Sequence, residues 1–208
     1  MFERLTDQIT SENDLRAHIG MPARLSVAKS LTRLDGHCRD FIARSPFVVI
    51  GSGDGQGHFD VSPKGDPPGF VQVLDDITLA IPDRPGNRRA DTLGNILLQP
   101  SVGLLFLVPG SGDTLRVNGR AALVRDTWLL DRMKVRGRAP SLAIAVEVEE
   151  AFFHCAKCVI RSGLWEANDW QPVDGLAPLA KILADQTQLD TEAQMQQAVD
   201  ESYRDRLY

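Results

Sequence analysis

The sequence lacks long apolar runs, is poor in cysteine and carries no excess of positive charge, and each shortage excludes a class of protein. Its three cysteines among 208 residues are too few, and odd in number, for a disulfide framework, so we expect reduced thiols. No apolar stretch approaches the roughly 20 residues that cross a bilayer, and the opening residues lack the basic start and apolar centre of a secretory signal. The sequence therefore predicts no membrane association and a cytoplasmic location.

The charge balance is acidic. Lysine and arginine number 23 against 28 aspartates and glutamates, which gives a net charge of −5 at pH 7. Non-specific nucleic-acid binding depends on a broad basic surface that displaces counterions, so we expect no nucleic-acid partner. The 43% of hydrophobic and 25% of charged residues are those of an ordinary folded protein, and we expect a single domain over residues 1–208.

The hydrophobic periodicity divides that domain into three regions. Residues 1–44 have a helical pattern, with starts near Ser11 and Asp35. Residues 45–170 alternate with the period of strands, and residues 171–208 return to a helical pattern. In this last region we expect two helices, one after Pro178 and one capped by Asp190 or Thr191.

The central region contains paired strand patterns joined by tight turns. Glycine-rich or acidic pairs of residues separate the strands of each pair, as in hairpins, and one helical stretch is inserted before the last strand. This order predicts a mainly β fold with flanking helices, an antiparallel barrel of six or seven strands that is closed or nearly closed. The expected strands are residues 46–52, 58–63, 70–74, 77–81, 102–109, 113–124 and 141–154, with the helix at residues 126–135.

Positive charge gathers at one point of this acidic chain, in residues 83–89, which we call the arginine turn. We expect a helix from Asn87 to about Gln99, with Asn87 as its N-cap and its apolar face at Leu93, Ile96 and Leu97. Arg88 and Arg89 would then lie in the first helical turn, where cations are unfavourable unless they hold an anion. A helix start with two guanidinium groups suits a phosphate dianion.

Two plainer interpretations remain open for these basic residues. The arginines could be solvated and pair with Asp83 or Asp91.

A second candidate cluster lies on the strand before the turn. Ser62 and Lys64 alternate with Asp60 on one strand face, where a hydroxyl and an ammonium group could join a phosphate site. Lys64 could equally be an exposed lysine of an edge strand.

These residues resemble the pyridoxamine 5′-phosphate oxidase-like, FMN-binding split-barrel family. The resemblance covers residues 41–170, and residues 41–121 are its most diagnostic part. It implies a split β-barrel, a homodimer and an FMN cofactor whose phosphate is held at the basic helix start. It also implies that Thr114 lies where the oxidases carry a glutamine near the flavin ring. The implied cofactor-binding residues on this part of the chain are Val61, Ser62, Lys64, Ile81, Pro82, Asp83, Asn87, Arg88, Arg89 and Thr114.

The resemblance further implies flavin sites at the subunit interface, completed by the partner chain. Lys157, Arg161 and Trp165 match the segment that family members contribute, and their spacing predicts one helical face. Trp165 could instead anchor the tail to the barrel. The chain does not carry the arginine-rich closing signature with which the true oxidases grip the vitamin phosphate, so vitamin oxidation is not expected.

The resulting hypothesis is an FMN-dependent oxidoreductase acting on a small-molecule substrate. A non-catalytic FMN-binding sensor or carrier is the alternative, and a split barrel that binds another phosphorylated ligand, such as a deazaflavin, is a third. Cys155 and Cys158 have the spacing of a redox pair, but we expect neither a dithiol centre nor a metal site, because the histidines lack matching spacing. Cys158 is expected to be a buried apolar residue.

Overall fold

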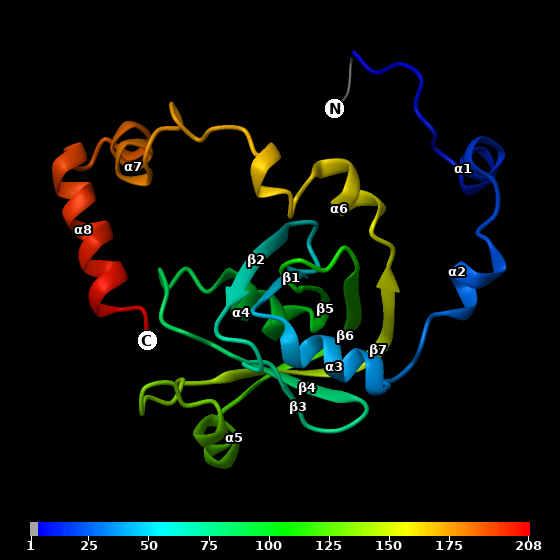
Figure 1. Ribbon diagram of the computed structural model, residues 1–208, viewed down its shortest axis with the longest axis horizontal. Coiled ribbons are helices and arrows are strands. Elements are labelled where there is room, and N and C mark those ends of the chain that lie inside the picture. The colour runs from blue at the N-terminus through cyan, green and yellow to red at the C-terminus, as the bar shows by residue number, and fades with distance from the viewer. Residues whose placement is uncertain (1–3) are drawn as a thin grey trace. The chain divides into compact units, whose positions relative to one another are not determined.

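A computed structural model describes residues 4–208, so the first three residues of the predicted N-terminal helical region lie outside the described residues (Figure 1). The chain separates into two compact units, Met1–Ser30 and Leu31–Tyr208. The first unit contains α1 (Glu12–Ile19) and α2 (Arg24–Ala28). The Ser11 side chain caps α1 by accepting a hydrogen bond from the main-chain N–H of Asp14, which confirms the predicted start.

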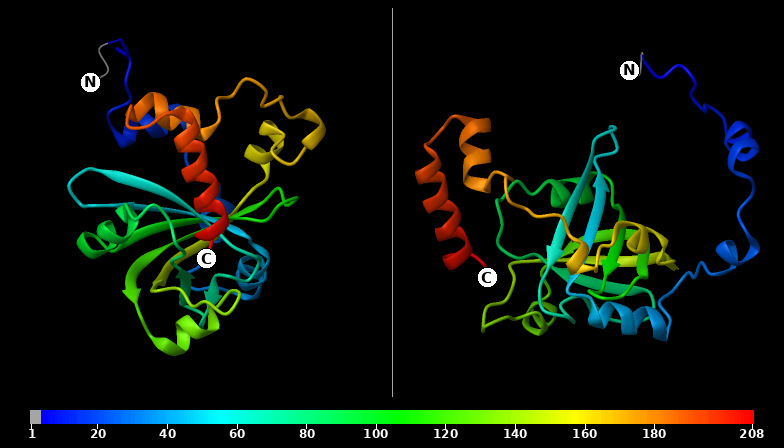
Figure 2. Two further views of the ribbon diagram at one scale, coloured as in Figure 1. Left: turned by 90° about the vertical axis from the view of Figure 1, so that its left-hand side faces the viewer. Right: turned by 45° about the horizontal axis from the view of Figure 1, so that its top comes forward.

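The second unit is built on a seven-stranded sheet in the order β2-β1-β5-β6-β7-β4-β3, and every neighbouring pair is antiparallel. β2 and β3 are its edges. Figures 1 and 2 show the sheet strongly curved, which confirms the predicted antiparallel split barrel with flanking helices. The strands are β1 (Phe47–Gly53), β2 (Phe59–Gly65), β3 (Gln72–Val73), β4 (Thr78–Pro82), β5 (Ser101–Leu107), β6 (Thr114–Val124) and β7 (Ala143–His154).

Alternate side chains of the central strands form the core inside the curve. In β1 the side chains of Val48 and Ile50 are fully buried, and the intervening residues are only partly buried. Helix α3 (Gly36–Arg44) adds Cys38 and Ile42 to the same core. The Asp35 carboxylate caps α3 by accepting the main-chain N–H of Cys38, as the sequence predicts.

Short helices follow the strands. They are α4 (Asp91–Leu98), α5 (Thr127–Arg132), α6 (Lys157–Ser162), the 3-10 helix η1 (Ala167–Asp169), α7 (Leu179–Thr187) and α8 (Glu192–Asp205). Pro178 precedes α7, and Thr191 forms a capping box with Gln194 at the start of α8, so both tail helices are confirmed. The expectation that Cys158 is buried is wrong, because α6 turns Val159 inward and leaves Cys158 exposed. Within residues 4–208, none of the helices has both the length and the apolar character that a membrane crossing requires.

Candidate functional site

A cavity of about 1010 Å³ lies beside edge strand β2. Its walls are residues 60–64 of β2, the arginine turn, the first turn of α4, the segment that leads into β7 and residues near the C-terminus. Cofactor sites in proteins typically occupy roughly 300–1,000 Å³ and combine apolar walls with a few placed polar groups. The cavity is therefore large enough for a nucleotide-sized ligand.

The wall formed by β2 is polar. Asp60, Ser62 and Lys64 are half-buried and line the cavity, and the more exposed Val61 and Pro63 between them also border it. The predicted alternation is thus confirmed. The Lys64 ammonium group lies 3.5 Å from the Asp83 carboxylate, so the ends of β2 and β4 meet across the split of the barrel. These two strands are not neighbours in the sheet, and charged side chains join them.

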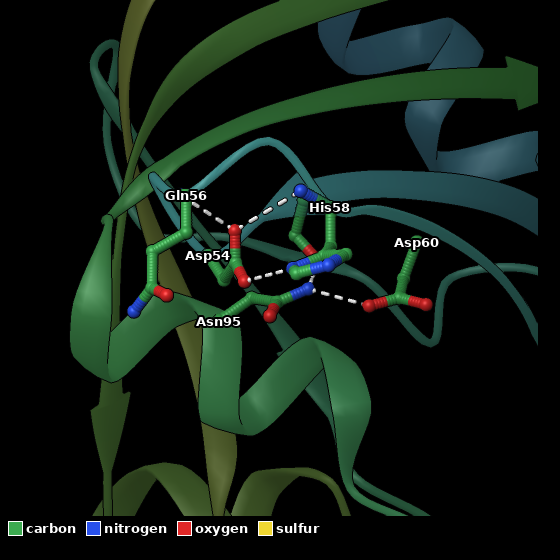
Figure 3. A network of polar contacts seen from close by, with 6 residues as sticks. Asp54, Gln56, His58, Asp60 and Asn95 are labelled. Atoms are coloured by element: carbon green, nitrogen blue, oxygen red, sulfur yellow. Dashed lines mark hydrogen bonds and ion pairs between the residues drawn. The ribbon is translucent and has the colours of Figure 1, made fainter.

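Asn95 of α4 fixes one acidic group of this wall (Figure 3). Its side-chain amide nitrogen donates to Asp60 Oδ2 at 2.8 Å and to the buried Ser52 hydroxyl at 3.1 Å. Both amide hydrogens are then used within the protein. The orientation of Asp60 at the cavity is therefore set by the helix that follows the arginine turn.

The arginine turn differs from the predicted helix start. Helix α4 begins at Asp91, four residues later than expected, and Arg88 and Ala90 have left-handed conformations with φ of 61° and 60°. Asn87 does not cap the helix, because its side-chain oxygen accepts the main-chain N–H of Arg89 at 3.0 Å and closes a turn of its own. Arg88 and Arg89 thus lie in a loop before the helix. Non-glycine residues in this conformation are uncommon and concentrate at functional sites.

The two arginines of this loop have different surroundings. Arg89 Nε lies 2.9 Å from Asp91 Oδ2, as in one of the plainer interpretations, and this pair is exposed. Within the part of the chain that the structure describes, the Arg88 side chain lines the cavity without a hydrogen-bond or ion-pair partner. No side chain caps the N-terminus of α4. An unpaired guanidinium and free helical N–H groups at one wall suit an anionic ligand.

A buried ion pair beneath the turn is missing from the sequence-based prediction. The Asp66 side chain has no exposed surface, and its Oδ2 accepts a hydrogen bond from Arg84 Nε at 2.6 Å. Arg84 also donates to the main-chain oxygen of Met133 at 2.8 Å. Arg84 belongs to the arginine turn, but nothing in the sequence pairs it with an aspartate 18 positions earlier.

The C-terminal residues also reach the site, which the sequence does not indicate. Asp205, Arg206 and Tyr208 line the cavity, and Tyr208 also lines a second cavity of about 420 Å³. The Tyr208 hydroxyl donates to Asp66 Oδ1 at 3.0 Å. This contact raises the pKa of the Tyr208 phenol, because the neighbouring carboxylate disfavours the phenolate.

Other predicted site residues lie away from the larger cavity. Ile81 and Pro82 are buried in β4, and only Pro82 borders the smaller cavity. Thr114 is buried at the start of β6, between Leu107 and His154. In β4 the side chains fill the core, because the strand packs within the sheet rather than at its edge.

Lys157, Arg161 and Trp165 do not line either cavity of their own chain. Lys157 and Arg161 lie on α6, but the helix ends at Ser162 and Gly163 follows in a left-handed conformation. The predicted helical face through Trp165 is therefore wrong. Trp165 instead donates its indole N–H to the main-chain oxygen of Ser111 at 2.7 Å, which ties this segment to the loop between β5 and β6.

Comparison with known proteins identifies the family. Residues 34–155, more than half of the chain, match the family model described as pyridoxamine 5′-phosphate oxidase. No curated protein sequence matches the chain.

Solved structures similar to this chain include the following three. HupZ of Group A Streptococcus is 18% identical, with a TM-score of 0.48 over 58% of this chain and 93% of that one. A putative pyridoxamine 5′-phosphate oxidase of Lactobacillus delbrueckii is 20% identical, with a TM-score of 0.47 over 59% and 95%. A FAD-binding protein of Mesorhizobium loti is 14% identical, with a TM-score of 0.41 over 60% and 96%. By the match over its barrel, the chain belongs to the pyridoxamine 5′-phosphate oxidase family.

Proposed function

We propose that the chain binds FMN in the cavity beside β2 and is an FMN-dependent oxidoreductase acting on a small molecule. The observation that carries this proposal is the Arg88 guanidinium, which lines a cavity of about 1010 Å³ without an internal partner. Arg88 is exposed to solvent, but its positive charge is unfavourable beside an uncapped helix N-terminus, and a phosphate dianion would remove that cost. Membership of the family supports the same ligand.

The residues around the cavity fit the parts of FMN. The phosphate would be held by Asn87, Arg88 and Arg89 together with the free N–H groups at the start of α4. The flavin ring would extend along β2, where Val61 offers an apolar surface, Ser62 a hydroxyl and Lys64 a positive charge. Bound FMN supplies hydride and electron transfer, so the chain's own residues are needed to bind and orient it rather than to act as nucleophiles. Ile81, Pro82 and Thr114 are proposed as flavin neighbours on the resemblance alone, whereas Asp83 also lines the cavity.

We also propose that the protein is a homodimer with flavin sites at the subunit interface. The outward face of β2 exposes Phe59 by 70% and Val61 by 65%, an unusual exposure for apolar strand residues. Gly51 of β1 and Gly103 of β5 continue this face by direct strand pairing with Val61 and with each other, and the Phe59 ring lies over Gly51. A second copy of the chain would bury this apolar surface.

The proposed dimer gives a role to residues that lie outside both cavities of their own chain. Lys157, Arg161 and Trp165 would reach the flavin site of the partner subunit. The exposure of Lys157 and Arg161 on α6 is compatible with this role. The ratio of light-scattering mass to chain mass, 22.9 kDa for one copy, tests the dimer directly.

Purification and spectroscopy test the cofactor. A yellow protein that releases FMN on denaturation, identified by mass, is the expected result. Release of a deazaflavin, or failure to bind added FMN, would contradict the proposal. Reduction of the bound flavin by NADH or NADPH, followed by reoxidation with an acceptor, is expected of an oxidoreductase. A flavin that stays oxidised with every reductant would instead identify a sensor or carrier.

A further inference from the structure

Tyr208 makes several contacts with residues far from it in the sequence. Its hydroxyl donates to the fully buried Asp66 carboxylate at 3.0 Å, and its main-chain oxygen accepts from Arg138 at 2.8 Å. The guanidinium groups of Arg84 and Arg136 lie 5.8 Å and 5.2 Å from the centre of its ring. Three residues therefore contact the side chain of Tyr208, and a fourth binds its main-chain oxygen.

Asp66 needs this contact. A carboxylate without solvent exposure is stable only when its oxygens are paired. Arg84 satisfies Oδ2, and Tyr208 is the group that donates to Oδ1. Through Arg84, the same carboxylate is linked to the segment that carries Arg88 and Arg89. The end of the chain and the arginine turn thus share one buried charged group.

The rest of the C-terminal tail has little else to hold it. Helix α8 buries none of its residues, and α7 buries only Ala180. Nine residues outside any helix or strand, 170–178, connect this helical pair to η1 and the barrel. A segment with few buried contacts opens at a low free energy. Docking of the tail therefore depends strongly on the contacts of Tyr208.

The docked tail is also a wall of the ligand cavity. Asp205, Arg206 and Tyr208 face the same space as Asn87 and Arg88, and Tyr208 borders the smaller cavity as well. When the tail is docked, these residues narrow the route to the arginine turn. When the tail is released, the cavity loses that wall and opens further to solvent.

We propose that residues 205–208 form a lid on the ligand cavity of their own chain, and that the contact of Tyr208 with Asp66 holds the lid closed. Entry and exit of the ligand are then both slowed while the tail is docked. The identity of the ligand used in the test rests on the proposed function, whereas the existence of the lid does not.

The test uses the full chain loaded with FMN and compares Tyr208→Phe with Tyr203→Phe. Tyr208→Phe removes only the hydroxyl that binds Asp66, and Tyr203 is an exposed residue of α8 that lines neither cavity. Stopped-flow flavin fluorescence gives the association and dissociation rates. A lid held by one hydrogen bond to a charged group predicts that both rates rise by about tenfold in Tyr208→Phe. The dissociation constant should change less than either rate, and Tyr203→Phe should match the wild type.

Two kinetic outcomes would overturn the lid. If dissociation alone becomes faster, Tyr208 touches the ligand and does not control access. If neither rate changes, the contact with Asp66 does not limit opening. Hydrogen exchange of residues 200–208 in the ligand-free protein adds a readout that needs no FMN, and it should be faster in Tyr208→Phe than in Tyr203→Phe. Equal exchange would also overturn the lid, whereas failure of the wild type to bind FMN would contradict the proposed function alone.

Discussion

The hydroxyl of Tyr208 donates a hydrogen bond to the carboxylate of Asp66, 142 positions earlier in the chain. Asp66 follows an edge strand, and its other oxygen accepts from Arg84, which follows β4 on the far side of the split. The Asp66 carboxylate therefore links the segment after β2 to the segment after β4 and to Tyr208. Because the Asp66 side chain is fully buried, the stability of the contacts among Asp66, Arg84 and Tyr208 depends on the charge of its carboxylate.

Asp66→Asn should destabilise the protein strongly. The substitution keeps the shape of the side chain but leaves the Arg84 guanidinium, only 15% exposed, without its anionic partner. Breaking a buried ion pair from one side costs about 3–5 kcal/mol. Urea unfolding should show a loss of about 3 kcal/mol in the free energy of unfolding. Asp76→Asn is the matched control, because the pair of Asp76 with Arg39 is 50% and 42% exposed and such pairs contribute about 0–1 kcal/mol. Equal effects of the two variants would show that Asp66 is not the stabilising anion described above.

Arg88→Ala should weaken FMN binding more than Arg89→Ala. Arg88 lines the cavity without a partner, whereas Arg89 already pairs with Asp91 at 2.9 Å. Loss of one charge-assisted contact to a phosphate costs about 1.5–3 kcal/mol of binding free energy. The double variant should lose several kcal/mol by the same reasoning. Fluorescence titration of the apoprotein with FMN measures these affinities.

A control arginine outside the cavity separates a local contact from a general charge effect. Arg44 of α3 pairs with Asp40 and is absent from both cavity walls. Arg44→Ala should leave FMN affinity unchanged. A loss equal to that of Arg88→Ala would instead point to long-range electrostatics, and retention of FMN by the double variant would remove the phosphate site from the arginine turn.

The fold could be predicted from the sequence because its signals are local. Alternation of apolar residues marks strands such as β1, and glycine-rich turns mark the hairpins, as between β1 and β2. Ser11, Asp35 and Thr191 act as the caps that their residue types favour. Each of these features depends on residues a few positions apart.

The start of α4 was not predictable in the same way. Asn87 is a favourable cap by type, but its side chain closes a turn with Arg89, and α4 starts after Ala90 in a left-handed conformation. Asparagine is favourable both as a helix N-cap and in a turn closed by its own side chain, so the residue type alone does not distinguish the two. Leu97, predicted on the buried face, is 74% exposed, because Thr92, Asn95 and Ile96 form the buried face of α4 instead.

The most distant contacts of the site were also missed. Asp66, Arg84 and Tyr208 meet only after the barrel has closed and the tail has docked. No periodic pattern relates positions so far apart. Their residue types are common on protein surfaces, so only the three-dimensional arrangement identifies them as a cluster.

Gly119→Ala should destabilise the barrel. Gly119 lies at an irregularity of the β6–β7 pairing, where Asn118 faces Glu150 and Gly119 faces Val148. A Cβ atom at Gly119 would overlap the main-chain carbonyl oxygen of Glu147, which cannot move without breaking the sheet. Overpacking of this kind costs about 1–3 kcal/mol or more, measurable by thermal or urea unfolding.

Gly94→Ala provides the opposite case. Gly94 lies inside α4, and a Cβ atom there would meet nothing within 4 Å. Alanine in place of glycine inside a helix stabilises by about 0.5–1 kcal/mol. The two glycine variants should therefore shift the unfolding midpoint in opposite directions. A shift in the same direction would mean that the close approach at Gly119 relaxes without cost.

His58 should titrate above its ordinary value. Its Nδ1 lies 2.6 Å from Asp54 Oδ2 in the turn between β1 and β2 (Figure 3), and this hydrogen bond raises the pKa of His58 while it lowers that of Asp54. The raised value means that the stabilisation by charged His58 is complete below about pH 6.5 and is lost as the pH rises through the pKa of the folded protein. For Asp54 the stabilisation is lost as the pH falls through its lowered pKa.

NMR titration of the imidazole protons measures this effect. In the wild type the midpoint for His58 should lie above about 6.5, and in Asp54→Asn it should return toward that value. His58→Gln should remove the signal and so confirm its assignment. A wild-type midpoint at or below the ordinary value would show that the pair does not form in solution.

The three cysteines should differ sharply in reactivity toward a thiol reagent such as DTNB. Burial, with a smaller contribution from a hydrogen bond to Asp35, raises the pKa of Cys38 to about 11, and Cys38 has no exposed surface. Because the thiolate is the reactive form, only about one in a thousand Cys38 side chains would be ionised at pH 8. Cys155 and Cys158 are both exposed.

At pH 8 two thiols should therefore react in the native protein and the third only after unfolding in urea. Cys155→Ser should halve the fast phase, whereas Cys38→Ser should leave it unchanged and remove the slow one. Rapid reaction of all three thiols in the native protein would mean that α3 does not keep Cys38 in the core. It would then also contradict the packing of this helix against the barrel.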